Sequence, residues 1–186
     1  SQAKVINLGL FYGMGKAKLQ AELGLNTKDE AEKLFNKYHN RVPFVKDLMN
    51  NTSRDASGSG YITTLLGRKC RFDKWEEAVY NPGVLKVPMS HAEAEKKYGG
   101  ESIRRAFTYK ALNKLIQGSA ADMTKKAMLD LYKEGIIPHI QVHDELDISV
   151  ESPEQAKKII EIMENAVKLN IPNKVDYEEG NNWGEI

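Results

Sequence analysis

Most apolar positions of this chain recur every three to four residues, as they do on one face of an α-helix. The spacing predicts a short helix within residues 15–26 and longer helices over residues 1–12, 27–39, 43–55, 101–134 and 153–169. Thr27 and Glu30 have the spacing of a capping box, which predicts where the third helix begins. Residues 73–100 are weakly patterned and rich in proline and glycine, so a loop with a short helix is expected there.

Two other stretches have the pattern of β-hairpins. Residues 58–72 contain two β-rich runs, and the second run is basic. In residues 140–150, apolar positions recur at period two on both sides of an acidic turn, which places His143, Asp144 and Glu145 at the tip of a tight hairpin. A last edge strand is expected around residues 175–177. The elements together predict an α+β fold.

The acidic hairpin is the first candidate for chemistry. Asp144 and Glu145 are adjacent carboxylates on a rigid turn, and carboxylate oxygens are the ligands that hard divalent cations prefer. The alternative is an ordinary acidic turn, because such turns are common on protein surfaces.

The first helix is the second candidate. Lys4, Leu8 and Tyr12 are four residues apart, so they form one stripe that offers a cation, an apolar platform and an aromatic ring. A lysine suits a phosphate, and a flat ring stacks on a base. Gly13 then ends the helix and allows another chain to come close. An amphipathic helix with one exposed lysine is the alternative.

The long helix carries two amides on one face. Asn113 and Gln117 are four residues apart, and each can both donate and accept hydrogen bonds. The small residues that follow, 118–121, allow close packing.

Composition narrows the class of protein. The length of 186 residues suits one domain or one and a half. A single cysteine excludes an internal disulfide framework. No apolar run approaches the length of a membrane span, and no signal-peptide pattern is present, so no membrane partner is expected. The single cysteine, Cys70, fits a reducing cytosol, so the expected location is the cytoplasm, that of a bacterial host if the protein is encoded by a phage.

The distribution of charge is uneven although the net charge is only +1. Residues 1–74 contain 13 Lys and Arg against 7 Asp and Glu, whereas residues 75–186 contain 14 against 19. A basic first half and an acidic second half fit a polyanion bound on one side and a metal on the other. Chance asymmetry in a soluble protein is the alternative.

Four motifs, taken in order, resemble the C-terminal part of family A DNA polymerases, the bacterial polymerase I and phage group. Residues 4–13 are similar to the helix of the fingers that binds the nucleotide, and residues 60–68 to the fingers hairpin. Residues 113–122 resemble the helix beside the template-primer, and residues 141–146 resemble the metal-binding motif of the palm. The resemblance covers the chain except for about residues 75–100.

The resemblance implies three regions. Residues 1–75 would be helical fingers with a small β-hairpin, and residues 76–100 a variable connection. Residues 101–186 would be half of the antiparallel palm sheet, packed against helices.

The resemblance also implies roles for the acidic hairpin. Asp144 and Glu145 would be catalytic residues and ligands of two Mg²⁺ ions. His143 would contact the primer and act in catalysis.

In the fingers, the resemblance implies that Lys4, Leu8 and Tyr12 bind the incoming dNTP. Tyr12 and Gly13 would lie at the template base. Leu8 stands where the family usually has Phe or Tyr, so altered selection against sugar-modified nucleotides is expected.

For DNA, the resemblance implies that Asn113 and Gln117 read the minor groove of the new duplex. Arg68 of the fingers hairpin is expected to bind DNA. Tyr109 stands where bacterial members carry an arginine, so either one contact with the duplex is lost or Lys110 replaces it.

The implied function is template-directed DNA synthesis by two-metal nucleotidyl transfer, with template-primer DNA and dNTPs as partners. The helical pattern is already present at residue 1 without an initiator methionine, so a piece of a longer polymerase is expected. The second catalytic aspartate of the family belongs to an earlier motif, which a preceding segment of the same chain or of a separate chain would supply. A split gene interrupted by an intein and a proteolytic fragment are both open origins. The competing functions are a non-catalytic DNA-binding remnant and a fragment of a single-subunit RNA polymerase.

Overall fold

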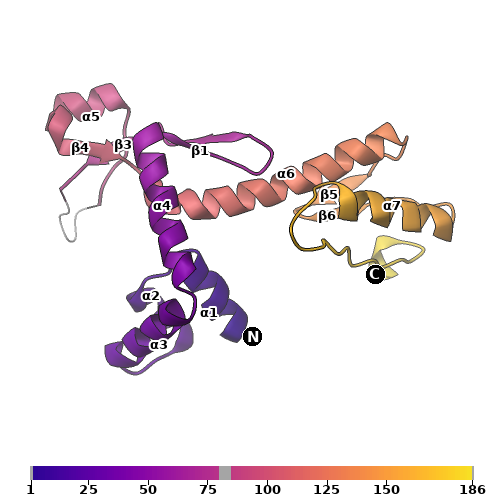
Figure 1. Ribbon diagram of the computed structural model, residues 1–186, viewed down its shortest axis with the longest axis horizontal. Coiled ribbons are helices and arrows are strands. Elements are labelled where there is room, and N and C mark those ends of the chain that lie inside the picture. Colours follow the sequence, from indigo (N-terminus) through magenta and orange to yellow (C-terminus); the bar gives the residue numbers. More distant parts are fainter. Residues whose placement is uncertain (1, 80–84, 186) are drawn as a thin grey trace. The chain divides into compact units, whose positions relative to one another are not determined.

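The computed structural model describes residues 2–79 and 85–185, and Figure 1 shows its helices and strands. The chain divides into two compact units, residues 1–116 and 117–186. Both consist of helices and small antiparallel strand pairs, so the fold is α+β, as predicted. Within the described ranges, no helix is both long enough and apolar enough to cross a bilayer.

The first unit begins with four helices, and all four were predicted. Their bounds are Gln2–Phe11 (α1), Lys16–Leu23 (α2), Lys28–Arg41 (α3) and Pro43–Ser59 (α4). The predicted capping box starts α3, because the Thr27 hydroxyl accepts a hydrogen bond from the Glu30 backbone N–H at 3.2 Å. The Glu30 carboxylate in turn accepts from the Thr27 N–H at 3.4 Å. Pro43 occupies the first turn of α4, where no hydrogen-bond donor is needed.

The rest of the first unit contains two strand pairs and a short helix. The predicted fingers-like hairpin is β1 (Tyr61–Thr63) paired with β2 (Lys69–Arg71). Sequence patterns missed the second pair, β3 (Trp75–Glu77) with β4 (Ile103–Arg105). The helix α5 (His91–Tyr98) lies between β3 and β4 in the sequence.

The long helix starts ten residues later than predicted. Residues 101–110 form β4 between two 3₁₀ turns, Gly100–Ser102 (η1) and Thr108–Lys110 (η2). Phe107 has a φ of +64°, which no right-handed helix can include. The helix α6 therefore runs over Ala111–Lys133, and its residues from Gln117 onward belong to the second unit.

A small apolar cluster joins the helices and the first hairpin of the first unit. Ala56, Ile62, Phe72 and Ala111 are buried together, and Cys70 and Leu115 pack against them. The cluster fixes the end of α4 against β1 and the start of α6.

The second unit contains α6 from Gln117, the strands β5 (Ile140–Val142) and β6 (Glu145–Asp147), α7 (Pro153–Asn165) and the 3₁₀ turn η3 (Trp183–Glu185). Its core is a cluster of Leu131, Ile136 and Ile159, against which Leu146 and Ile148 of the hairpin segment pack. The edge strand expected around residues 175–177 is wrong, because that segment has no strand pairing.

The apolar residues of the two strands of the acidic hairpin lie on opposite faces of the strand pair. Val142 lies opposite Glu145 and Ile140 lies opposite Asp147 across a two-residue turn. Directly opposite residues lie on the same face of a strand pair. Leu146 consequently faces the core while Ile140 and Val142 remain 44% and 39% exposed on the other face.

Candidate functional site

The predicted nucleotide stripe lies on α1 and the turn that follows it. The Lys4 side chain is exposed, Leu8 is 44% exposed, and Tyr12 is half-buried. The Tyr12 N–H donates to the Leu8 carbonyl at 3.0 Å, which continues the helical turn by one residue. The three side chains therefore keep the four-residue spacing that places them on one face.

The end of α1 is shaped by Gly13. Its φ is +83°, and its N–H donates to the Leu10 carbonyl at 3.1 Å. A Cβ atom at this position would lie 2.9 Å from the terminal methyl of Met49 on α4. The left-handed backbone is therefore the main requirement for glycine here, because the flexible end of the Met49 side chain can shift.

A groove of about 580 Å³ collects several predicted site residues within the first unit. Leu8, Tyr12, Gly13 and Asn113 all line it. Lys4 and Arg68 do not. The structure therefore brings residue 113 to residues 8–13, which are about a hundred positions away in the sequence.

Two residues of α2 also line the groove and were missed from the sequence. Lys18 and Glu22 are four residues apart and both exposed. Their i, i+4 spacing on a predicted helix was the available signal. They add a cation and a carboxylate to a groove that otherwise consists of apolar groups, a phenol and an amide.

Asn113 contributes a polar atom with unused hydrogen-bonding capacity. Its Oδ1 is buried and has no hydrogen-bond partner among the described residues. A buried amide oxygen without a donor is costly and uncommon, so a ligand or an ordered water is the expected partner. Gln117 follows one turn later on α6, and its side chain is exposed.

Arg68 lies just before β2 in the first hairpin, with an exposed side chain. Its backbone is fixed on both sides: its N–H donates to the Thr64 hydroxyl at 3.0 Å, and its carbonyl accepts from the Thr64 N–H at 2.9 Å. The side chain therefore extends from a rigid turn.

The acidic hairpin differs in one detail from the prediction. His143 and Asp144 form the two-residue turn, whereas Glu145 is the first residue of β6 and lies opposite Val142. His143 has a φ of +54°, which is rare for a residue other than glycine. The Gln141 side-chain amide donates to the His143 carbonyl and ties the turn to β5.

The carboxylates of the hairpin are accessible. Asp144 and Glu145 are exposed, and within residues 2–79 and 85–185 neither forms a hydrogen bond or an ion pair through its side chain. Those ranges contain no group of three or more potential metal-ligating side chains. The hairpin can therefore offer a cation two carboxylates, which is only part of a ligand set.

Comparison with known proteins places these features in one family. Residues 1–185 match the sequence profile of DNA polymerase family A. The chain is 34% identical to the DNA-directed DNA polymerase of Pseudomonas phage M6, with 98% of this chain and 29% of that protein covered. It is 36% identical to DNA polymerase I of Caldicellulosiruptor bescii, with 100% of this chain and 20% of that protein covered.

A solved structure agrees with these relatives. The fold is similar to the POL domain of Pol1 from M. smegmatis in complex with DNA primer-template and dNTP, with a TM-score of 0.67 and 29% identity. The similarity covers 92% of this chain and 28% of that one. The chain thus spans less than a third of the length of these proteins, and over nearly its whole length it belongs to DNA polymerase family A.

Proposed function

We propose that this chain supplies the nucleotide-binding helix and one catalytic aspartate of a DNA polymerase that copies a DNA template from dNTPs. The observation that carries the proposal is the groove in which Leu8, Tyr12, Gly13 and Asn113 meet. These residues belong to two of the motifs that resemble the family, and the profile of the family matches both. The relative from phage M6 is named for this activity, and the M. smegmatis domain was solved with primer-template and dNTP.

On the nucleotide side, Lys4 provides a mobile cation for the triphosphate. Leu8 provides an apolar surface for the sugar, but it lacks the flat ring that the family usually has at this position. The half-buried Tyr12 ring is held at the edge of the groove, where it can stack on the base of the nascent pair.

On the DNA side, the amides of Asn113 and Gln117 read the minor groove of the new duplex. Acceptors in that groove occupy similar places for every correct base pair, so amide donors can test pairing without reading sequence. Arg68 provides a charged contact from its rigid turn.

Family A polymerases use divalent metal ions, and the acidic hairpin fits this requirement. Asp144 and Glu145 offer accessible carboxylate oxygens, the donors that Mg²⁺ prefers. When bound, two Mg²⁺ ions would favour the ionised primer 3′-hydroxyl and offset charge on the departing pyrophosphate. His143 would position the primer terminus. A polymerase segment that precedes this one, in the same chain or a separate chain, would supply the second aspartate.

Primer extension in the presence of Mg²⁺ tests the proposal. The chain is assayed alone and together with the polymerase segment that precedes it, and Asp144→Ala is compared with Glu154→Ala, an exposed acid on α7. The proposal is supported if the mixture synthesises DNA with the wild-type chain and with Glu154→Ala but not with Asp144→Ala. DNA binding without Mg²⁺-dependent synthesis in the mixture would instead favour a non-catalytic DNA-binding protein.

A further inference from the structure

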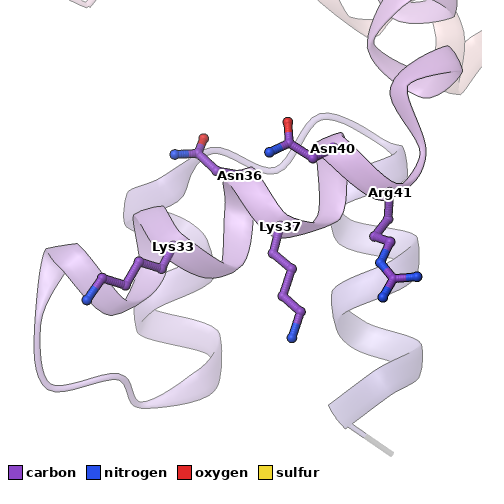
Figure 2. Close-up of a pocket in the computed structure, with 5 residues that line it drawn as sticks. All are labelled: Lys33, Asn36, Lys37, Asn40 and Arg41. Atoms are coloured by element: carbon purple, nitrogen blue, oxygen red, sulfur yellow. The ribbon is translucent and has the colours of Figure 1, made fainter.

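The outer face of α3 carries a polar stripe that the proposed site does not use. It consists of Lys33, Asn36, Lys37, Asn40 and Arg41, and we refer to it as the α3 stripe. The five side chains line a shallow hollow of about 560 Å³. Figure 2 shows them on consecutive turns of the one helix, with Asn36 and Asn40 on one side and Lys37 and Arg41 on the other.

The cations of the stripe are not neutralised. Within the described residues, Lys33, Lys37 and Arg41 form no hydrogen bond or ion pair through their side chains. The acids of α3 lie in its first turns, and two of them are already occupied. Glu30 closes the capping box, and Glu32 forms an ion pair with Lys16. The positive charge therefore persists along the second half of the helix.

The stripe is not needed to hold α3 in place. Other positions of the helix supply its packing, among them buried Ala31 and half-buried Leu34. The Tyr38 hydroxyl donates to Asn7 Oδ1 on α1 at 3.2 Å, and burial raises the pKa of Tyr38, so it stays protonated as a donor. The helix is thus anchored next to α1, the helix of the proposed nucleotide site, while the stripe remains available.

The chemistry of the stripe fits a phosphodiester backbone. It combines three cations with two amides and contains no aromatic ring, so its chemistry suits phosphate oxygens better than the faces of bases. From Lys33 to Arg41 the helix rises about 12 Å. Phosphates follow one another about every 3.4 Å along a strand of B-DNA, so this length spans several of them.

We propose that the α3 stripe binds the phosphate backbone of template-primer DNA, as a contact outside the groove of α1 and α6. The proposal rests on the proposed function, since it takes DNA as the partner of this chain. Contacts of this kind position DNA and carry no sequence preference.

Equilibrium binding by fluorescence anisotropy, without Mg²⁺ and over a series of salt concentrations, tests the proposal. The variant Lys33→Gln/Lys37→Gln/Arg41→Gln is compared with a charge-matched control, Lys96→Gln/Lys157→Gln/Lys168→Gln, which removes three lysines from other helices and loops. Each lost phosphate contact removes about 0.7 to 0.9 from the slope of log affinity against log salt. The stripe variant should therefore have a slope shallower by about 2 and bind at least tenfold more weakly at low salt.

Two further arms sharpen the result. Lys33→Arg/Lys37→Arg retains the charge and should bind as the wild type does. A blunt duplex and a primer-template with a long template overhang show which part of the DNA the stripe contacts. The stripe variant should lose affinity for both DNAs if the stripe contacts the duplex, and only for the second DNA if it contacts the overhang. If the wild type binds template-primer DNA but the stripe variant and the control variant bind it with equal affinity, the proposed role of the stripe is wrong and the proposed function is unaffected. Absence of template-primer binding at low salt, both by the wild-type chain alone and by its mixture with the preceding polymerase segment, overturns the proposed function and the stripe together.

Discussion

Replacement of Gly60 by alanine should destabilise the first unit through a specific clash. Gly60 is buried at the end of α4 with a φ of +80°, and a Cβ atom there would lie 2.7 Å from Cζ of Arg105. Arg105 is not free to move without cost. Its Nη1 donates to the Phe72 carbonyl at 3.0 Å, and its guanidinium lies 4.6 Å from the centroid of the Trp75 ring.

The expected magnitude follows from these contacts. An L-residue in the left-handed region costs about 1–2 kcal/mol. Displacing Arg105 loses one hydrogen bond of about 1 kcal/mol and a cation–π contact of about 0.5–1 kcal/mol. Gly60→Ala should therefore lower the free energy of unfolding by about 3 kcal/mol. Gly67→Ala is the matched control. Gly67 has a φ of +89°, but a Cβ atom there would meet no other atom within 4 Å, so the substitution should cost only the backbone contribution.

Urea unfolding followed by tryptophan fluorescence measures the difference. Trp75 lies in the affected contact, and Trp183→Phe removes the second of the two tryptophans. In an Arg105→Ala background, the cost of Gly60→Ala should shrink to that of Gly67→Ala, because the clash and the lost contacts have been removed together. Equal costs for Gly60→Ala and Gly67→Ala in the wild-type background would refute the reasoning.

Four other predictions each concern a single residue. Burial and the nearby positive charge of Lys46 lower the pKa of His39. The contribution of neutral His39 to the free energy of unfolding should therefore be complete above pH 6.5 and be lost as the pH falls through the lowered pKa. Urea titrations at several pH values should show a weaker pH dependence for His39→Phe. Thr27→Ala removes the capping box of α3 and should cost about 1 kcal/mol, measured by circular dichroism in urea. Gln141→Leu removes the amide that ties the turn of the acidic hairpin and should lower the rate of primer extension in the mixture without weakening DNA binding. Leu8→Phe should change discrimination against sugar-modified nucleotides, and unchanged incorporation ratios would contradict the role given to Leu8.

Helix starts were predictable because their signals are local. Thr27 and Glu30 are three residues apart, and both hydrogen bonds of the capping box close within that distance. Pro43 likewise marks the first turn of α4 by its own geometry. Signals of this kind need no information about distant parts of the chain.

The second strand pair could not be predicted in the same way. β4 exists because it pairs with β3, and Arg104 forms an ion pair with Glu76 at 2.8 Å across the two strands. The two residues are 28 positions apart. The local pattern of residues 101–110 is compatible with a helix, and only the distant partner decides otherwise.

The length of the turn decides which apolar residues of the acidic hairpin lie on the same face. Alternation predicts correctly that Ile140 and Val142 share one face and that Leu146 and Ile148 share one face. A turn of two residues makes Val142 the partner of Glu145, so the two apolar sets lie on opposite faces. A turn longer by one residue would have placed them together.

The groove was predictable in part. The four-residue spacing of Leu8 and Tyr12 predicted that their side chains share one face. No pattern could show that Asn113 joins them, since that contact depends on the packing of the start of α6 within the first unit.

Backbone geometry distinguishes the acidic hairpin from the structural turns of the chain. Within the described part, Phe107 and His143 are the non-glycine residues with positive φ. Phe107 begins η2, where its carbonyl accepts from the Lys110 N–H at 2.9 Å and the turn leads into α6, so its conformation serves the fold. His143 lies in a two-residue turn where glycine would adopt the same φ at less cost, by about 1–2 kcal/mol. The side chain of Gln141 helps to hold this costly conformation, and the imidazole is left exposed beside Asp144. This costly conformation supports the role proposed for His143 at the primer terminus.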